Sequence, residues 1–215
     1  MTDLVLNLTK PGDAPKKLVL NLKKAEAFKV RLSWDGGNDL DLHALFAVNM
    51  GNGAKVKTFD DVLSTYNVER EIEDENGKMI RVGTLPLAAD RTFVVHNGAL
   101  KHSPDALDGS AEGDDEWMLV HPSLIKVPEG GQIEIPLLAM IHPQGEVTFK
   151  NVKNARFIVE KTSGEVLLTV NLSDQFANFS GVQGGSIVLE ESGSSFKAVG
   201  VGFNTDFNGV VGAFT

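Results

Sequence analysis

Apolar and polar residues alternate with a period of two along much of this 215-residue chain. The clearest runs are AFKVRLSW at residues 27–34 and DLDLHALFAV at residues 39–48. Successive side chains of a β-strand point to opposite faces of its sheet, so this alternation buries one face and leaves the other in water. Turn signals separate the runs at intervals of roughly 8 to 12 residues. The sequence therefore predicts an all-β protein, an antiparallel β-sandwich of roughly ten strands.

Further strands are predicted where short apolar runs are bounded by turn residues. The segment LVLNL occurs twice, at residues 4–8 and 18–22, with a turn rich in Pro and Gly between the copies. Asn76-Gly77 marks a two-residue hairpin turn. The remaining predicted strands occupy residues 92–96, 116–120, 132–140, 155–160, 165–172, 186–191 and 196–203.

Length and composition favour a single domain covering residues 1–215. A chain of this size can enclose one well-buried core, and many β-sandwiches reach this length. Residues 49–91 interrupt the alternation with polar, glycine-rich sequence, so we expect an inserted hairpin and loop segment there. Only residues 123–126 and 174–178 are expected to form short helical turns.

Charge and composition argue against several classes of function. The formal net charge is −9 and the isoelectric point is about 5.0, whereas a nucleic-acid-binding surface needs clustered Lys and Arg. Cys is absent, which excludes disulfides, thiolate metal sites and Cys nucleophiles. No apolar run approaches the roughly 18 to 20 residues of a membrane-spanning helix, and no secretory signal is evident. We therefore expect no nucleic acid, no membrane insertion and a cytoplasmic location.

Asp39 and Asp41 form a first acidic pair in one predicted strand. Residues two apart on a strand share a face, so the two carboxylates lie roughly 6 to 7 Å apart and repel each other. A hard cation would remove this repulsion, and Gly36 and Gly37 would let backbone carbonyl oxygens approach as further ligands. The alternative is the charged, solvent-facing side of an edge strand.

A second acidic cluster lies in HSPDALDGSAEGDDE, residues 102–116, which contains no Lys or Arg. Ca²⁺ binds six to eight oxygen ligands in irregular geometry, and a loop of Asp, Glu, Ser and Gly offers such ligands. The alternative is a solvated acidic loop without an ion. The carboxylates of this loop are Asp105, Asp108, Glu112, Asp114, Asp115 and Glu116.

Known motifs for other metal sites and for catalysis are not met. Neither acidic cluster has the spacing of an EF-hand, and without Cys the five scattered His residues do not favour zinc. GSAEG at residues 109–113 does not place Ser at the centre of G-x-S-x-G, and GVGFNT at residues 200–205 lacks the third Gly of G-x-G-x-x-G. We therefore expect no enzymatic activity.

The two acidic clusters, in this order, resemble the tellurium-resistance TerD family of calcium-binding stress proteins. DLDLH at residues 39–43 is similar to the D-F-D-L-D strand of that family, and HSPDALDGSAEGDDE is similar to its H-x-G-D-N-x-T-G-E-G-x-G-D-D-E loop. The resemblance covers most of the chain outside about residues 49–91. Later segments that also resemble the family are KVP at residues 126–128, MIH at 140–142, FKNVKNARFIV at 149–159 and FKAVGVGF at 196–203.

The resemblance implies a Ca²⁺-binding β-sandwich in which the two clusters hold one or two ions. His43 stands where the family often has a third Asp, and residues 104–111 depart from the family loop, so the number of ions stays open. The residues implied as metal ligands are Asp39, Asp41, Asn97, Asp105, Asp108, Glu112, Asp114, Asp115 and Glu116.

The function implied by the resemblance is a non-catalytic Ca²⁺-binding module of the tellurium-resistance and stress-response type. We expect it to act through protein partners or self-assembly. The alternative is a structural or phage virion-associated protein, a decoration or tail component built on a TerD-like domain and located in the virion.

Overall fold

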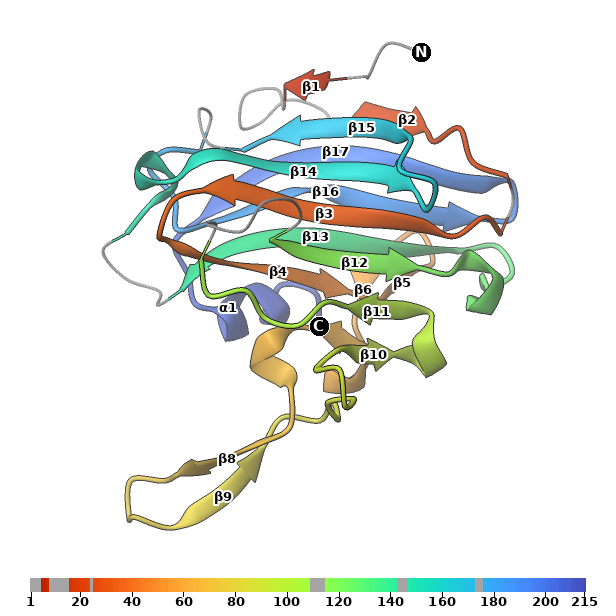
Figure 1. Cartoon of the computed structure of the whole chain (residues 1–215). Helices are drawn as coiled ribbons and strands as arrows, with labels where there is room; N and C mark the ends of the chain where they lie inside the picture. Colours follow the sequence, from red (N-terminus) through yellow and green to blue (C-terminus); the bar gives the residue numbers. More distant parts are fainter. Residues whose placement is uncertain (1–4, 8–15, 24, 109–114, 143–146, 173–175) are drawn as a thin grey trace.

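The computed structural model describes residues 5–7, 16–23, 25–108, 115–142, 147–172 and 176–215. Two β-sheets pack face to face over most of this chain, and a two-stranded hairpin projects from them (Figure 1). In the described sheets neighbouring strands run antiparallel, except for the parallel pair β1 (Val5–Asn7) and β15 (Val166–Asn171). The predicted all-β sandwich is confirmed.

The first sheet contains seven strands. In spatial order they are β1, β15, β14 (Lys153–Lys161), β3 (Phe28–Asp35), β12 (Glu116–Val120), β11 (Leu100–His102) and β10 (Phe93–Val95).

The second sheet contains eight strands. Six of them lie in the order β2 (Lys16–Val19), β17 (Gly193–Phe203), β16 (Gly181–Glu190), β13 (Gln132–His142), β4 (Asp39–Leu45) and β7 (Val62–Leu63). Beside this row, β5 (Ala47–Asn49) pairs with β13 and with β6 (Ala54–Lys55). The two LVLNL copies therefore separate, because β1 joins the first sheet and β2 joins the second.

The main core fills the space between the sheets, as the alternation predicts. Val30 and Leu32 of β3 and Ile135 and Leu137 of β13 are fully or almost fully buried there. Burying one such aliphatic side chain stabilises the fold by roughly 1.5 to 3 kcal/mol, so these alternating positions hold the two sheets together.

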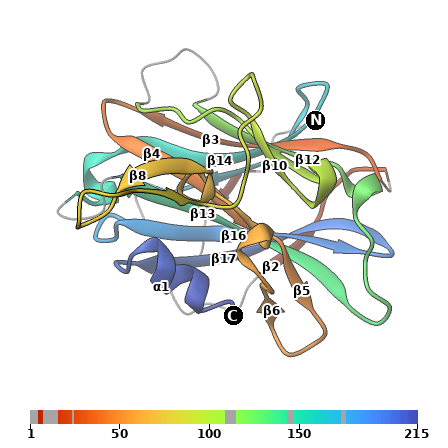
Figure 2. The same cartoon turned by 90° about the horizontal axis from the view of Figure 1, so that it is seen from below.

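A second, smaller core lies on the outer face of the eight-stranded sheet. The helix α1 (Phe207–Gly212) packs Phe207, Val210 and Val211 against outward-facing residues of β13, among them Leu138 and Met140. Figure 2 shows α1 on the side of the eight-stranded sheet that faces away from β3 and β12. The sequence predicts no helix in this region, so α1 corrects that prediction. Of the expected helical turn at residues 174–178, the described part forms a hydrogen-bonded turn, in which the Phe179 N–H donates to the Phe176 carbonyl at 2.9 Å.

Residues 49–91 form short strands, 3-10 helices and a hairpin. Besides β6 and β7, they form the 3-10 helices η1 (Phe59–Asp61) and η2 (Thr65–Asn67). They also form the hairpin of β8 (Arg70–Glu73) and β9 (Met79–Val82). The predicted two-residue turn at Asn76-Gly77 is wrong, because Asp74 pairs with Lys78 and the loop therefore has three residues, of which only Gly77 has a positive φ. The segment therefore both covers the end of β4 and projects an arm away from the sandwich (Figure 1).

The other 3-10 helices are η3 (His96–Gly98), η4 (Pro122–Leu124) and η5 (Phe149–Asn151). In the part of the chain that the structure describes, no helix is long and apolar enough to cross a membrane.

Candidate metal centre

The candidate site lies where one edge of β4 has no neighbouring strand among the described residues. β4 pairs with β13 along one side, but on the other side only Ala44 and Leu45 pair, with β7. Side chains of the opposite sheet bond the free edge at Leu42: Oε2 of Glu116 accepts its N–H at 2.5 Å, and Nε2 of His102 donates to its carbonyl at 2.9 Å. These side chains replace a strand, and they place a carboxylate beside β4.

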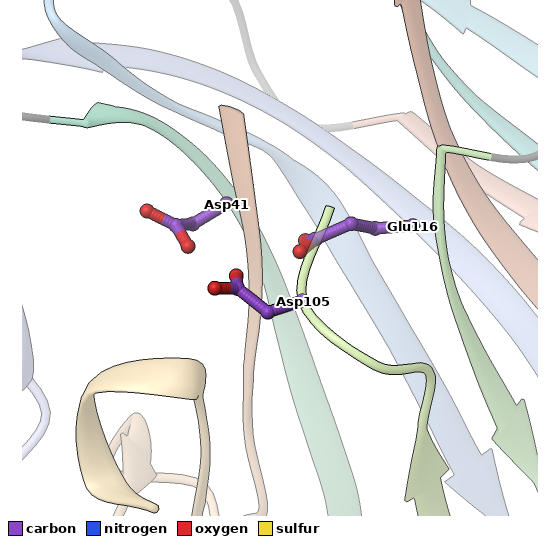
Figure 3. A group of neighbouring side chains, drawn as sticks. All are labelled: Asp41, Asp105 and Glu116. Carbon is purple, nitrogen blue, oxygen red and sulfur yellow. The ribbon is translucent and has the colours of Figure 1, made fainter. Parts of the chain in front are cut away.

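Three carboxylates from separate elements meet at this edge (Figure 3). Asp41 lies on β4, Glu116 begins β12, and Asp105 lies in the loop that follows β11. One oxygen atom of each lies within 4.8 Å of the others. Asp41 and Glu116 are buried, with 2% and 0% of their surface exposed, whereas Asp105 is exposed. The group therefore opens to solvent on the side of Asp105.

Hydroxyl groups of the inserted segment orient the Asp41 carboxylate. Thr65 Oγ1 donates to its Oδ1 at 2.8 Å, and Tyr66 Oη donates to its Oδ2 at 2.6 Å. An ionised carboxylate only accepts hydrogen bonds, so the single hydroxyl proton of Tyr66 is donated to Asp41. Tyr66 Oη therefore accepts from His142 Nδ1, which lies 2.9 Å away. Sequence reasoning missed Thr65 and Tyr66, because nothing in η2 predicts that it meets β4.

The electrostatics of the group are unfavourable without a cation. Burial raises the pKa of Glu116 well above its usual range, and the nearby charge of Asp41 raises it further. Burial also raises the pKa of Asp41, although the hydrogen bonds from Tyr66 and Thr65 oppose this shift. The pKa of Asp105 is raised by burial and then by Asp41. Like charges with little solvent therefore face one another.

The described residues supply little compensating charge. No Lys or Arg among them forms an ion pair with Asp41, Asp105 or Glu116. His102 Nε2 lies 3.9 Å from Glu116 Oε2; burial lowers the pKa of His102, although the hydrogen bonds to the Ser103 and Leu42 carbonyl oxygens oppose this shift. The charges of His142 and Arg91 oppose the rise in the pKa of Asp105 without cancelling it. Carboxylate oxygens with little counter-charge suit a hard metal ion, so the group fits a metal ion.

Comparisons with known proteins identify a family for this chain. The family model described as the TerD domain matches residues 92–214. The chain belongs to the TerD family. A search of the curated proteins gives no match.

Two solved structures share the TerD-type fold with this chain. A homologue of telluride resistance protein (TerD) from Streptomyces coelicolor A3(2) aligns with a TM-score of 0.53 at 17% identity, over 87% of this chain and 95% of that chain. A protein of unknown function, SAV2460, aligns with a TM-score of 0.53 at 16% identity, over 88% and 96% of the two chains. At these identities the similarity shows the fold alone.

Several of the ligands that the TerD resemblance implies lie beside the three-carboxylate group. Asp39 is partly exposed, and within the described residues its buried Oδ1 has no hydrogen-bond partner. Burial, followed by the charges of Asp41 and Asp105, raises the pKa of Asp39 to about 6. Asp108 is exposed, and its charge also acts on Asp39. Both carboxylates are therefore close enough to contribute to the field of the site.

The remaining implied ligands have other places. Asp115 is buried, and its Oδ2 accepts the N–H of Trp34 at 3.0 Å, so it extends the pairing of β12 with the end of β3. Asn97 is exposed in η3, at the opposite end of β11 from Asp105. It is not part of the group of three carboxylates. Glu112 and Asp114 lie outside the described residues.

His43, at the position of the third Asp of the TerD motif, belongs to the second core. Its side chain is completely buried, and its ring contacts Tyr66 and Phe207 at centroid distances of 5.0 and 4.7 Å. Within the described residues neither ring nitrogen has a hydrogen-bond partner. Burial lowers the pKa of His43 to about 3, so the ring is neutral. The change from Asp to His therefore suits the apolar cover that α1 provides.

Proposed function

We propose that this TerD-family chain is a non-catalytic Ca²⁺-binding module of the tellurium-resistance and stress-response type, acting through protein assembly. The observation that carries the proposal is the meeting of Asp41, Asp105 and Glu116, whose oxygen atoms lie within 4.8 Å of one another. A divalent ion there would convert the repulsion between buried carboxylates into attraction.

The donor atoms favour Ca²⁺ over other common metal ions. All three are carboxylate oxygens, whereas zinc sites in proteins favour His nitrogen and Cys sulfur. Mg²⁺ demands near-ideal octahedral geometry, but Ca²⁺ accepts six to eight oxygens in an irregular arrangement. Further oxygens would come from Asp39 and from two residues of the acidic loop that contains Asp105, namely Glu112 and Asp114. The family resemblance implies all three as ligands.

Two of the three His side chains near the site, His43 and His102, support a non-catalytic role. The third, His142, is exposed, and its Nδ1 contacts Tyr66 Oη. His43 is buried among apolar and aromatic side chains. His102 is completely buried, with its two ring nitrogens 2.9 Å from the Leu42 carbonyl oxygen and 2.8 Å from that of Ser103. Neither ring is therefore placed to exchange protons with a substrate, as a general base must.

The biological part of the proposal rests on the family. The relative from Streptomyces coelicolor is described as a homologue of a telluride resistance protein. Action through assembly is supported by the inserted segment, which presents Phe59, Ile72 and Met79 with 54%, 38% and 57% of their surface exposed. Exposed apolar side chains on a projecting segment are suited to protein contacts.

Calorimetric titration of the purified chain with Ca²⁺ and with Mg²⁺ tests the proposal. The wild type is expected to bind Ca²⁺ more tightly than Mg²⁺, and Asp41→Asn is expected to abolish the Ca²⁺ heat. Asp60→Asn is the matched control, because Asp60 is an exposed Asp of η1 outside the carboxylate group. A wild type that takes up no Ca²⁺ after treatment with a chelator would refute the proposal.

A further inference from the structure

The hairpin of β8 and β9 is an arm with free edges (Figure 1). All four residues of β8 are exposed, and β9 alternates between exposed and half-buried residues. In the described chain these two strands pair with each other and with no further strand. A two-stranded hairpin by itself is marginally stable in water, so an additional strand would stabilise the arm.

The two faces of the arm differ in polarity. On one face Ile72 lies directly opposite Ile80, and nearer the sandwich Val82 lies opposite Arg70. The other face carries two cross-strand pairs, Glu71 with Arg81 and Glu73 with Met79.

The register of the hairpin determines which backbone groups are free. The N–H of Asp74 donates to the carbonyl of Lys78 at 2.9 Å, which makes these residues a hydrogen-bonded pair. Hydrogen-bonded and non-hydrogen-bonded pairs alternate along an antiparallel ladder. The N–H and C=O groups of Met79 and Arg81 therefore point away from β8, along the free edge of β9.

The free edge of β8 is unsuited to pairing with a copy of itself. By the same alternation its outward backbone groups belong to Glu71 and Glu73. Every two-fold register of β8 that uses these groups sets one Glu directly opposite another. Like charges directly opposite one another destabilise a strand pair, so acidic side chains protect this edge.

One two-fold register of β9 pairs the outward backbone groups of Met79 with those of Arg81, and it has no clash of charges. Setting Arg81 opposite itself would bring like charges together, and setting Met79 opposite itself would place Arg81 opposite Gly77 of the turn. In the register without a clash, Met79 lies opposite Arg81 of a second copy, and Ile80 lies opposite Ile80 of the second copy. A row of four isoleucines, Ile72 and Ile80 of each copy, then crosses a four-stranded sheet. We propose that β9 pairs with β9 of a second copy in this register, making the arm a site of self-association.

This inference deepens the assembly role proposed above and rests on it, but it does not depend on Ca²⁺. A two-fold pairing closes after two copies. If β8 paired instead with β9 of a following copy, Glu71 would lie opposite Arg81. Each added copy would still present one free edge, so this pairing would produce open polymers. The two arrangements therefore differ in the size of the particle that they produce.

Cysteine cross-linking tests the register directly, because the wild-type chain contains no Cys. In the proposed register residue 80 forms a non-hydrogen-bonded pair with its copy, and Cα atoms of such pairs lie about 4.5 Å apart. Ile80→Cys is expected to give a disulfide-linked dimer on mild oxidation. Ile72→Cys, on the same face of the other strand, is the matched control and is expected to stay monomeric. Equal cross-linking of both variants, or none in either, would overturn the register.

Sedimentation velocity of the full chain over a range of concentrations tests the association itself. Arg81→Pro removes an outward N–H and leaves the bonds within the hairpin in place. Since two hydrogen bonds are lost per dimer, it is expected to weaken dimerisation about thirtyfold. Arg81→Ala keeps the N–H and measures the effect of the side chain alone. Glu71→Pro, on the opposite edge, is expected to leave dimerisation unchanged.

The same measurement separates this inference from the calcium proposal. The dimer is expected to persist in a chelator. A wild type that stays monomeric at every concentration, or that forms open polymers, would overturn the β9 pairing even if Ca²⁺ binds. A dimer that forms in a chain without Ca²⁺ uptake would refute the calcium proposal alone.

Discussion

Glu116 of β12 and Leu42 of β4 are joined across the sandwich by a hydrogen bond of 2.5 Å, from the Leu42 N–H to Glu116 Oε2. Glu116 Oε1 also lies 3.3 Å from the N–H of Ala106, which donates to it. The same carboxylate belongs to the candidate metal group with Asp41 and Asp105. One side chain therefore closes the free edge of β4 and provides charge to the site.

The two roles of Glu116 can be separated by substitution. Glu116→Gln keeps an oxygen that accepts from Leu42 and removes the charge, whereas Glu116→Ala removes both. In a chelator, Glu116→Gln is expected to lie within about 1 kcal/mol of wild type, and Glu116→Ala to lose about 2 to 4 kcal/mol of unfolding free energy. Urea unfolding measures both. A raised pKa means that Glu116 is readily neutral without an ion, and Gln imitates that neutral form. If Glu116→Gln destabilises the fold as much as Glu116→Ala, the raised pKa is contradicted.

Ca²⁺ is expected to raise the thermal stability of the wild type. At a free concentration about 100 times the dissociation constant, binding to the folded state adds about 2.7 kcal/mol. For a chain of this size that corresponds to a rise in Tm of about 5 to 10 °C. Differential scanning calorimetry with Ca²⁺ and with chelator measures the shift. Asp60→Asn should keep the shift and Asp41→Asn should lose it; an unchanged wild-type Tm contradicts the prediction.

Asp39 is expected to make the ion-free protein less stable as the pH rises. Its pKa is raised in the fold from 3.8 to about 6, so between these values the folded state binds more protons than the unfolded state. Stability from this group is present at low pH and is lost as the pH approaches and passes 6. In chelator at pH 7.5, Asp39→Asn should therefore be more stable than wild type by about 1 kcal/mol, after allowance for its partial exposure.

The comparison must be repeated near pH 4, where both forms of residue 39 are largely neutral in the fold. There the difference between Asp39→Asn and wild type should shrink towards zero. Urea unfolding at the two pH values measures this change, and an equal difference at both would contradict the pKa shift.

Tyr66 is expected to support metal binding without touching the ion. Its hydroxyl donates to Asp41 Oδ2, and loss of a partner that orients a metal ligand typically weakens affinity by about 10-fold to 100-fold. Tyr66→Phe should therefore lower Ca²⁺ affinity by about tenfold, as should Thr65→Val. Thr169→Val, on β15 of the other sheet, is the control. Unchanged calorimetric affinity in Tyr66→Phe would show that the hydroxyl does not position Asp41.

The core of the sandwich requires a glycine at position 184. A Cβ atom there would lie 2.6 Å from the ring of Phe157, in the bulged part of β16. Gly184→Ala is expected to cost about 1 to 3 kcal/mol of unfolding free energy because the ring must move. Gly37→Ala is the control, since a Cβ at Gly37 meets nothing within 4 Å. Equal stability of the two variants would contradict the tight packing.

The fold class could be predicted because burial of one face of a strand makes apolar and polar residues alternate along the sequence. The period of two identified β3 and β4, although both faces of β4 are buried, and Asn76 and Gly77 marked the position of the hairpin but not its three-residue loop. The helix α1 could not be predicted in the same way. It is short, contains two glycines, and is stabilised by Phe207, Val210 and Val211 against β13. That contact joins distant parts of the chain.

The candidate site was predictable in part. Asp41, Asp105 and Glu116 were all expected from the two acidic clusters, and the structure brings them together. Asn97 was also expected, but it lies at the other end of β11. The similarity of residue types along the chain does not show that Asn97 and Asp105 lie at opposite ends of β11.

The sequence by itself determined the all-β class, the two acidic clusters and the family, because alternation and motif spacing are local properties of the chain. Only the tertiary structure decided that β4 has a free edge, that Glu116 and His102 bond it, and that Thr65 and Tyr66 orient Asp41. These contacts join residues 24 to 74 positions apart. Their energies depend on how the two sheets and the inserted segment pack, and no short stretch of sequence encodes that packing.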